Sequence, residues 1–215
     1  MATVKAVISD FGGVLTSPLM GSFEAFRERS GVSLEVLGQS IAALAIAQGS
    51  NPLFELETGR LSEGEFLGAL AQELTQRMGR TIELDGFGET YFAELDVNEP
   101  FLAYLRELQT RGYRLAICTN NVREWEPLWR AMVPVDELFE VVIDSSAVGS
   151  RKPERQIYEE TLAALGVQAP STVFVDDLEI NCAAARQLGM RAVWFQTTEQ
   201  AMADIESVLA DGAGR

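Results

Sequence analysis

Side chains capable of chemistry follow several apolar runs of this chain, each at the point where a predicted strand ends. Asp10 follows the first run and precedes Gly12 and Gly13, which permit a tight turn. By itself, an Asp before glycines is an ordinary turn signal. Thr119 and Asn120 follow a second apolar run, where a hydroxyl and an amide suit phosphate oxygens but are also common helix caps.

Two further segments add a lysine and a pair of acids. Lys152 stands just before Pro153, which is expected to start a helix, although a single lysine is usually a solvated surface charge. Asp176 and Asp177 close another apolar run, and Asn181 follows one helical turn later. Two adjacent acids at a buried strand end are costly unless a cation or hydrogen-bond donors compensate them. Together with the first two strand ends, these residues predict one site.

Phosphoryl transfer is the chemistry that this set favours. Asp10 and Asp177 offer hard oxygen ligands for Mg²⁺, and Asp176 adds a third carboxylate. A free oxygen of Asp10 would attack phosphorus, and water would hydrolyse the resulting aspartyl-phosphate. We expect Lys152 to steady the nucleophile and the developing charge, while donors on the second strand end bind the phosphoryl group. The predicted catalytic residues are Asp10, Thr119, Asn120 and Lys152, and the last three are also the predicted substrate-binding residues.

The elements that must position these residues follow an alternating pattern. Helical repeats of apolar residues, such as those in 100–110 and 154–165, alternate with short runs rich in β-branched residues. This alternation predicts an α/β fold with a Rossmann-like, doubly wound parallel sheet covered by helices on both faces. The predicted strands are Val4–Ser9, Tyr113–Cys118, Val141–Ile143, Thr172–Val175 and Arg191–Phe195.

About 80 residues separate the first two predicted strands, far more than one crossover needs. They have helical character and almost no strand pattern, so we expect a small helical cap inserted after the first strand. The predicted division is a core domain of residues 1–16 and 98–215 and a cap domain of residues 17–97. The cap would cover the carboxyl ends of the strands, where open α/β sheets bind ligands.

Composition excludes several other function classes. The 215 residues are 47% hydrophobic, enough for one substantial core, and the net charge of −15 argues against nucleic acid as a partner. The absence of histidine removes Ser–His and Cys–His nucleophile pairs and His-ligated zinc. Cys118 and Cys182 lie in apolar segments and are expected to be buried free thiols. No apolar run approaches the roughly 20 residues of a membrane span, and no signal peptide is evident, so we expect a cytoplasmic protein without a membrane partner.

These motifs resemble, in the same order and across nearly the whole chain, the four motifs of the haloacid-dehalogenase superfamily. Asp10 fits its nucleophile motif, Thr119 the second, Lys152 the third, and Asp176-Asp177 with Asn181 the fourth. The stretch 115–195 is similar to the phosphatase domain at the N-terminus of soluble epoxide hydrolases, and 57–66 is similar to its helical cap. The resemblance implies a Mg²⁺-dependent phosphatase of a small phosphorylated molecule.

Gly12 departs from the family pattern. Phosphatases of the superfamily usually have a second Asp at this position, which protonates the leaving group and later activates water, and its loss typically lowers the rate about 10²–10⁴-fold. The resemblance implies that the backbone carbonyl of this residue binds the metal, so the predicted ligands are Asp10, Gly12, Asp176 and Asp177. Two alternatives stay open: a phosphate- or ligand-binding protein with weakened catalysis, and a C–halogen hydrolase, whose Tyr at this position is absent here.

Substrate choice is expected to depend on residues near the cap. Trp125 and Trp129 lie four residues apart after the second motif, and they predict either an aromatic wall near the entrance or packing against a neighbouring element or a second subunit. Arg60 and Arg123 are candidates for an anionic substrate tail or are plain surface charges. Exposed aromatic residues on a helix would also allow a homodimer, and the sequence does not decide this.

Overall fold

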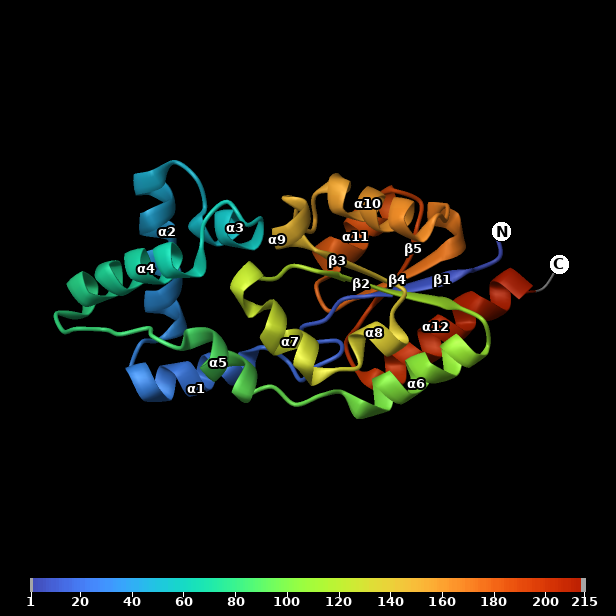
Figure 1. Ribbon diagram of the computed structural model, residues 1–215, viewed down its shortest axis with the longest axis horizontal. Helices are drawn as coiled ribbons and strands as arrows, with labels where there is room; N and C mark the ends of the chain where they lie inside the picture. Colours follow the sequence, from blue (N-terminus) through green and yellow to red (C-terminus); the bar gives the residue numbers. More distant parts are fainter. Residues whose placement is uncertain (1, 214–215) are drawn as a thin grey trace.

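The computed structural model describes residues 2–213, which form a parallel sheet flanked by helices, with a helical insert at one end (Figure 1). The sheet has five strands in the order β3-β2-β1-β4-β5, and all neighbouring pairs are parallel. The predicted α/β, Rossmann-like fold is confirmed, and each predicted strand overlaps an observed one. The strands are β1 (Ala6–Ser9), β2 (Arg114–Thr119), β3 (Val141–Asp144), β4 (Thr172–Asp176) and β5 (Arg191–Trp194).

Alternating side chains of the strands feed two separate hydrophobic clusters, one on each face of the sheet. In β1, Val7 belongs to one cluster while Ala6 and Ile8 belong to the other, as the two-residue period of a strand requires. The Val7 face is covered by α6 (Glu99–Thr110), α7 (Glu126–Met132), α8 (Val135–Leu138) and α12 (Thr198–Ala213). The other face is covered by α10 (Arg155–Leu165) and α11 (Glu179–Gln187).

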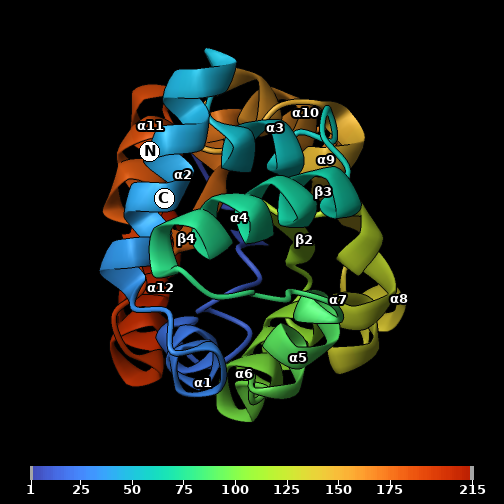
Figure 2. The same ribbon diagram turned by 90° about the vertical axis from the view of Figure 1, so that its left-hand side faces the viewer.

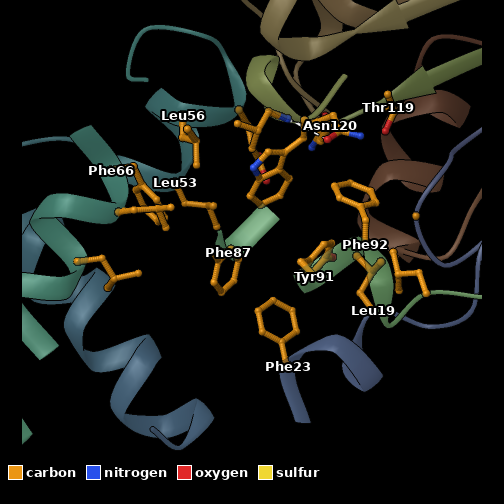
Figure 3. Close-up of a pocket in the computed structure, with 18 of the residues that line it drawn as sticks. Leu19, Phe23, Leu53, Leu56, Phe66, Phe87, Tyr91, Phe92, Thr119 and Asn120 are labelled. Carbon is orange, nitrogen blue, oxygen red and sulfur yellow. Dashed lines mark hydrogen bonds between the residues drawn. The ribbon is translucent and has the colours of Figure 1, made fainter. Parts of the chain in front are cut away.

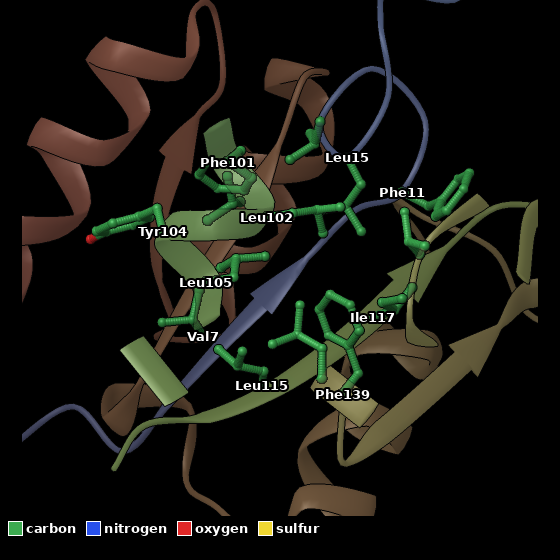
Figure 4. Close-up of a cluster of buried hydrophobic side chains, with 14 of the residues drawn as sticks. Val7, Phe11, Leu15, Phe101, Leu102, Tyr104, Leu105, Leu115, Ile117 and Phe139 are labelled. Carbon is green, nitrogen blue, oxygen red and sulfur yellow. The ribbon is translucent and has the colours of Figure 1, made fainter. Parts of the chain in front are cut away.

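Helix α6 shows how local sequence sets this packing. The side chain of Asn98 caps it by accepting a hydrogen bond from the backbone of Phe101, and a proline occupies its first turn. Apolar residues at helical spacing then form one buried face, and Figure 4 shows Leu102 and Leu105 above Val7 of the sheet. The sequence pattern predicted this helix to within one residue.

The insert between β1 and α6 is entirely helical. It contains α1 (Met20–Ser30), α2 (Leu34–Gln48), α3 (Pro52–Glu57), α4 (Glu63–Met78) and α5 (Phe87–Ala93), and most of their buried apolar residues form a third cluster. Thr16 and Val97 form an antiparallel bridge where the chain enters and leaves it. Figures 1 and 2 place the insert at the end of the sheet toward which the strands run. The domain division at residues 17–97 stays a prediction.

Several short elements lie outside the predicted pattern. They are α3, α8, α9 (Ser145–Val148) and two 3₁₀ turns, η1 (Arg123–Trp125) and η2 (Ala169–Ser171). Each is too short to show a helical repeat in the sequence; α3 is instead fixed by an Asn51 cap and Pro52 at its first position. Within residues 2–213, no single helix combines the length and apolar character of a membrane span. Helices α1 and α2 have that length and composition only when taken together, and the two are bent by 94° relative to each other.

Candidate active site

Strand register brings the predicted residues to one edge of the sheet. Ser9 of β1 pairs with Ile117 of β2 and with Val175 of β4, so the next residues along these strands lie beside one another. The backbone N–H of Asp10 donates a hydrogen bond to the carbonyl of Val175 at 2.8 Å. Asp10 therefore sits between the end of β2, which carries Thr119, and the end of β4.

Lys152 lies at the centre of this edge although it belongs to no strand. It comes from the loop between α9 and α10 and is 1% exposed. Its Nζ lies 2.8 Å from Asp10 Oδ1 and 2.7 Å from Asp176 Oδ2, so one ammonium bridges two buried carboxylates. A buried charge is stable only when it is paired in this way. The structure thus places the predicted site lysine in a buried ion-pair network and not on the surface, where a single lysine usually lies.

Asn120 has a different set of contacts from the one predicted for it. Its Nδ2 donates to the carbonyl of Lys152 at 3.0 Å, and its Oδ1 accepts from the backbone N–H of Lys152 at 2.8 Å. The amide side chain therefore holds the backbone of the lysine on both sides. A direct bond from Asn120 to substrate stays a prediction, whereas its positioning contact with Lys152 is present in the structure.

The three acids are not equivalent. Asp176 Oδ1 accepts hydrogen bonds from Asn181 and from the backbone of Leu178, and its Oδ2 contacts Lys152, so both oxygens already have protein partners. Asp10 Oδ1 accepts from the backbone N–H of Phe11 at 2.6 Å and contacts Lys152. Within residues 2–213, Asp10 Oδ2 accepts no hydrogen bond. One oxygen of Asp10 is therefore held and the other is available.

The donor set of this edge fits a hard divalent cation. One ligand oxygen from each of Asp10, Asp176 and Asp177 lies within 4.8 Å of the others, and when all three acids are ionised a single lysine leaves two of their negative charges uncompensated. Gly13 packs closely against it: its φ is +75°, and a Cβ there would lie 2.5 Å from Asp177 Oδ2. This position needs glycine for both reasons. Binding of metal by these residues and by the Gly12 carbonyl stays a prediction.

Burial and the neighbouring charges shift the pKa values of three side chains at this edge. Burial, with Asp176 and Asp177 nearby, raises the pKa of Asp10 to about 7 against the opposing effect of Lys152. Burial and then Asp176 raise the pKa of Asp177 to about 6. Burial alone would lower the pKa of Lys152, but Asp10 and Asp176 outweigh it and raise that pKa above its ordinary value. Without a cation, Asp10 and Asp177 therefore hold their protons to a higher pH than ordinary carboxyl groups do.

A leucine packs tightly against the position of the missing acid/base group. A Cβ on Gly12 would lie 3.2 Å from Leu19 Cδ2 and 3.3 Å from its Cδ1. Leu19 comes from the segment just before α1, so the insert fills with an apolar side chain the space beside Gly12. The sequence indicated the loss of the Asp but gave no signal for the leucine that replaces it in space.

A cavity of about 220 Å³ opens beside Thr119, Asn120 and Gly12 (Figure 3). Its walls are apolar and aromatic side chains from both the insert and the sheet edge. Sequence reasoning missed nearly all of them, because each apolar residue of a helical insert looks like ordinary core. Representative lining residues are Leu19, Phe23, Leu53, Phe66, Phe87 and Tyr91.

The two tryptophans, Trp125 and Trp129, lie in different environments. Trp125 closes the η1 turn and lines the cavity, as the aromatic-wall interpretation predicted. Trp129 lies in α7, is fully buried and contacts Phe11 with ring centroids 5.3 Å apart, as the packing interpretation predicted. Exposed aromatic residues for a homodimer therefore cannot include Trp129.

The other sequence candidates also have clear environments. Arg60 forms an exposed ion pair with Glu55, and Arg123 donates to the carbonyl of Ser146 at 2.9 Å. Cys118 and Cys182 are free and buried, as predicted. Neither arginine lines the cavity.

Comparison with known proteins gives consistent matches. A family model described as haloacid dehalogenase-like hydrolase matches residues 4–189. The chain is similar to phosphatase MT3486 of Mycobacterium tuberculosis, with 30% identity over 225 residues that cover 99% of each chain. It is 32% identical over 123 residues to bifunctional epoxide hydrolase 2 of Rattus norvegicus, an alignment that covers 54% of this chain and 22% of that protein. The chain spans less than half the length of some curated relatives that it matches.

A similar fold occurs in a solved structure. The HAD family enzyme bt-2542 of Bacteroides thetaiotaomicron, in complex with magnesium and inorganic phosphate, superimposes with a TM-score of 0.67 at 22% identity. The superposition covers 88% of this chain and 93% of that one. At this identity the likeness shows the shared fold.

Proposed function

This chain belongs to the haloacid dehalogenase-like hydrolases, and from that premise we propose that it is a magnesium-dependent phosphatase of a small phosphorylated molecule. The resemblance to this family and to the phosphatase domain of epoxide hydrolases is confirmed by the matches. The observation that carries the proposal is the state of Asp10. Lys152 and the Phe11 N–H hold its Oδ1, while Oδ2 accepts no hydrogen bond within residues 2–213, and the side chain lies in the same acidic trio as Asp177.

The proposed reaction has two displacements at phosphorus. Asp10 Oδ2 attacks the phosphoryl group, the P–O bond to the alcohol breaks, and the leaving oxygen takes a proton from water because Gly12 offers none. Water then attacks the aspartyl-phosphate, which releases inorganic phosphate and restores the Asp10 carboxylate. Lys152 keeps the nucleophile oriented and offsets charge during both steps, and the Thr119 hydroxyl donates to a phosphoryl oxygen.

Magnesium would neutralise phosphoryl oxygens when bound, held by Asp10, Asp177 and the Gly12 carbonyl. The fit rests on two uncompensated negative charges and on the oxygen-only donor set of this edge. The magnesium and phosphate in the bt-2542 structure support this choice. Asp176, whose two oxygens already bind protein groups, would act by holding Lys152.

Single-turnover hydrolysis of an activated aryl phosphate tests the proposal. We expect hydrolysis with Mg²⁺, phosphorylated protein after acid quench, and loss of both in Asp10→Asn. The matched control is Asp144→Asn, a buried acid that ends the neighbouring strand β3 and caps α9, a role that Asn retains. Hydrolysis that survives in Asp10→Asn would refute the nucleophile.

A ligand-binding role with weakened turnover is the second candidate, and the Leu19 side chain beside Gly12 favours it. Tight binding of phosphate with Mg²⁺, without release of alcohol from any ester, would support this candidate against the phosphatase. Metal-independent chloride release from a 2-chloro acid would instead support C–halogen hydrolysis.

A further inference from the structure

We propose that the cavity beside Thr119 binds an apolar, uncharged leaving group, so that the substrate is the phosphomonoester of an apolar alcohol with about nine carbon atoms. This inference rests on the proposed phosphatase function and adds the class of substrate to it. Three observations support this inference: the protein partners of the polar lining groups, the aromatic wall, and the volume of the cavity.

Most of the lining is apolar, and three of its charged or polar side chains already have protein partners. Glu57 is the charged side chain among the lining residues, and its Oε2 lies 2.5 Å from Nε of Arg151 in a largely buried ion pair. Trp125 Nε1 donates to Glu63 Oε1 at 2.6 Å, and the Asn120 amide binds the backbone of Lys152. Within residues 2–213, the hydroxyls of Thr119 and Tyr91 form no hydrogen bond, and the first of these is assigned to the phosphoryl group. A polyol placed here would therefore lose water from several hydroxyls and find few partners, which is unfavourable.

A second anionic group on the substrate would bind in this cavity even less favourably than a sugar hydroxyl. The lining contains no lysine or arginine, and Arg151, the cation that contacts the lining residue Glu57, is paired with it and lies over the ring of Phe54 at 3.9 Å. Diphosphorylated or carboxylated tails would enter without a counter-charge. The cavity therefore selects an uncharged tail.

One wall of the cavity is a cluster of three aromatic rings that contact one another. The ring centroid of Trp125 lies 5.5 Å from that of Tyr91 and 6.1 Å from that of Phe87, and the Phe87 and Tyr91 centroids are also 6.1 Å apart; the interplanar angles are 25°, 30° and 22°. Gly88 lets the indole approach, because a Cβ there would lie 2.5 Å from Trp125 Nε1. The hydrogen bond to Glu63 fixes the ring further, so the wall is preorganised for an apolar chain.

The volume sets the length of the chain. An apolar cavity of about 150 Å³ is known to hold benzene, which has six carbons, so the 220 Å³ here corresponds to about nine. Figure 3 shows Thr119 and Asn120 at one side of the cavity and Leu53 and Phe66 at the other. A tail that starts at the phosphoryl site would end near Phe66.

The test is a series of straight-chain alkyl phosphates from ethyl to dodecyl, compared with glycerol phosphate and a hexose phosphate. Burial of each methylene is expected to raise kcat/KM about fourfold. We expect the rise to stop near nine carbons and the two polyol phosphates to be poor substrates. The activated aryl phosphate is measured in parallel as the readout of the proposed phosphatase function.

Two variants sharpen the test. Phe66→Ala is expected to move the longest useful chain upward by several carbons, because it enlarges the far end of the cavity. Leu44→Ala is the matched control: it truncates an apolar residue of the same hydrophobic cluster that does not line the cavity, so the optimum length should stay the same.

Binding of non-hydrolysable alkyl phosphonates separates the two claims. Hydrolysis of the aryl phosphate with no dependence on alkyl length, or with preference for the hexose phosphate, would overturn the substrate class and leave the phosphatase intact. Phosphonate affinity that rises with chain length without any hydrolysis would support the apolar ligand class and overturn the phosphatase. Absence of both would overturn both.

Discussion

Asp177→Asn should stabilise the metal-free protein, and the gain should grow with pH. Burial and Asp176 raise the pKa of Asp177 from 3.8 to about 6, so the folded state resists the loss of this proton. The protonated Asp177 makes its full contribution to the free energy of unfolding below pH 3.8. This contribution is lost as the pH rises through about 6, where the folded protein also releases the proton. The charged carboxylate therefore destabilises the folded protein at pH 8, and asparagine removes that charge.

The size of the effect follows from the shift. Two pKa units correspond to about 3 kcal/mol at pH 8, where both states have lost the proton. At pH 5, about midway between the two pKa values, the unfolded state has released its proton while the folded state retains it, and about half of this effect is present. Asp177 is only partly buried, so solvent screening lowers the value at pH 8 to about 1.5 kcal/mol. The expected gain at pH 5 is then below about 1 kcal/mol.

Urea unfolding in EDTA at pH 5 and pH 8, followed by tryptophan fluorescence, measures both values. Asp85→Asn is the control, since it removes one exposed negative charge of the insert from a chain with a net charge of −15. Mg²⁺ should stabilise the wild-type protein more than the Asp177→Asn variant, because binding to the folded state is weakened by loss of a proposed ligand. Equal gains from both variants, or a gain that falls with pH, would refute the reasoning.

Three further outcomes are expected. Lys152→Met should lower the free energy of unfolding by about 3–5 kcal/mol, more at pH 8 than at pH 5, because it leaves Asp10 and Asp176 buried without their cation; urea unfolding at both pH values checks this. Gly12→Asp should raise kcat on an unactivated alkyl phosphate about 10²-fold when combined with Leu19→Ala and much less alone, since Leu19 occupies the space; equal rates in both would contradict this. Ser62→Ala removes the capping box of α4 and should lower thermal stability by about 1 kcal/mol while kcat/KM is unchanged.

Local patterns were sufficient for much of the fold. Strand and helix periods in the sequence depend on neighbours a few residues apart, so β1, α6 and α10 could be predicted within a residue or two. Parallel strands end at a common edge, and this rule alone brought Asp10, Thr119 and Asp176 together before any coordinates. Short elements such as α3 and α9 carry too few repeats for that reasoning.

What each side chain contacts was decided by tertiary structure. The strand-end pattern predicted Lys152 and Asn120 as site residues, and the resemblance pointed to Lys152 again. Only the fold shows that one amide holds the lysine backbone while the ammonium bridges Asp10 and Asp176. Trp125 and Trp129 look alike in sequence, yet one lines a cavity and the other packs in the core.

The sequence by itself determined the chemistry available to this protein: carboxylates, a lysine and a hydroxyl at strand ends, no histidine, and no acid at position 12. The tertiary structure decided the environment in which that chemistry operates, from the free oxygen of Asp10 to the leucine beside Gly12 and the apolar cavity next to them. The reason is physical. Residue types and their spacing fix local periodicity, whereas burial, pairing and cavity shape arise from contacts between segments far apart in the sequence, such as the insert and the sheet edge.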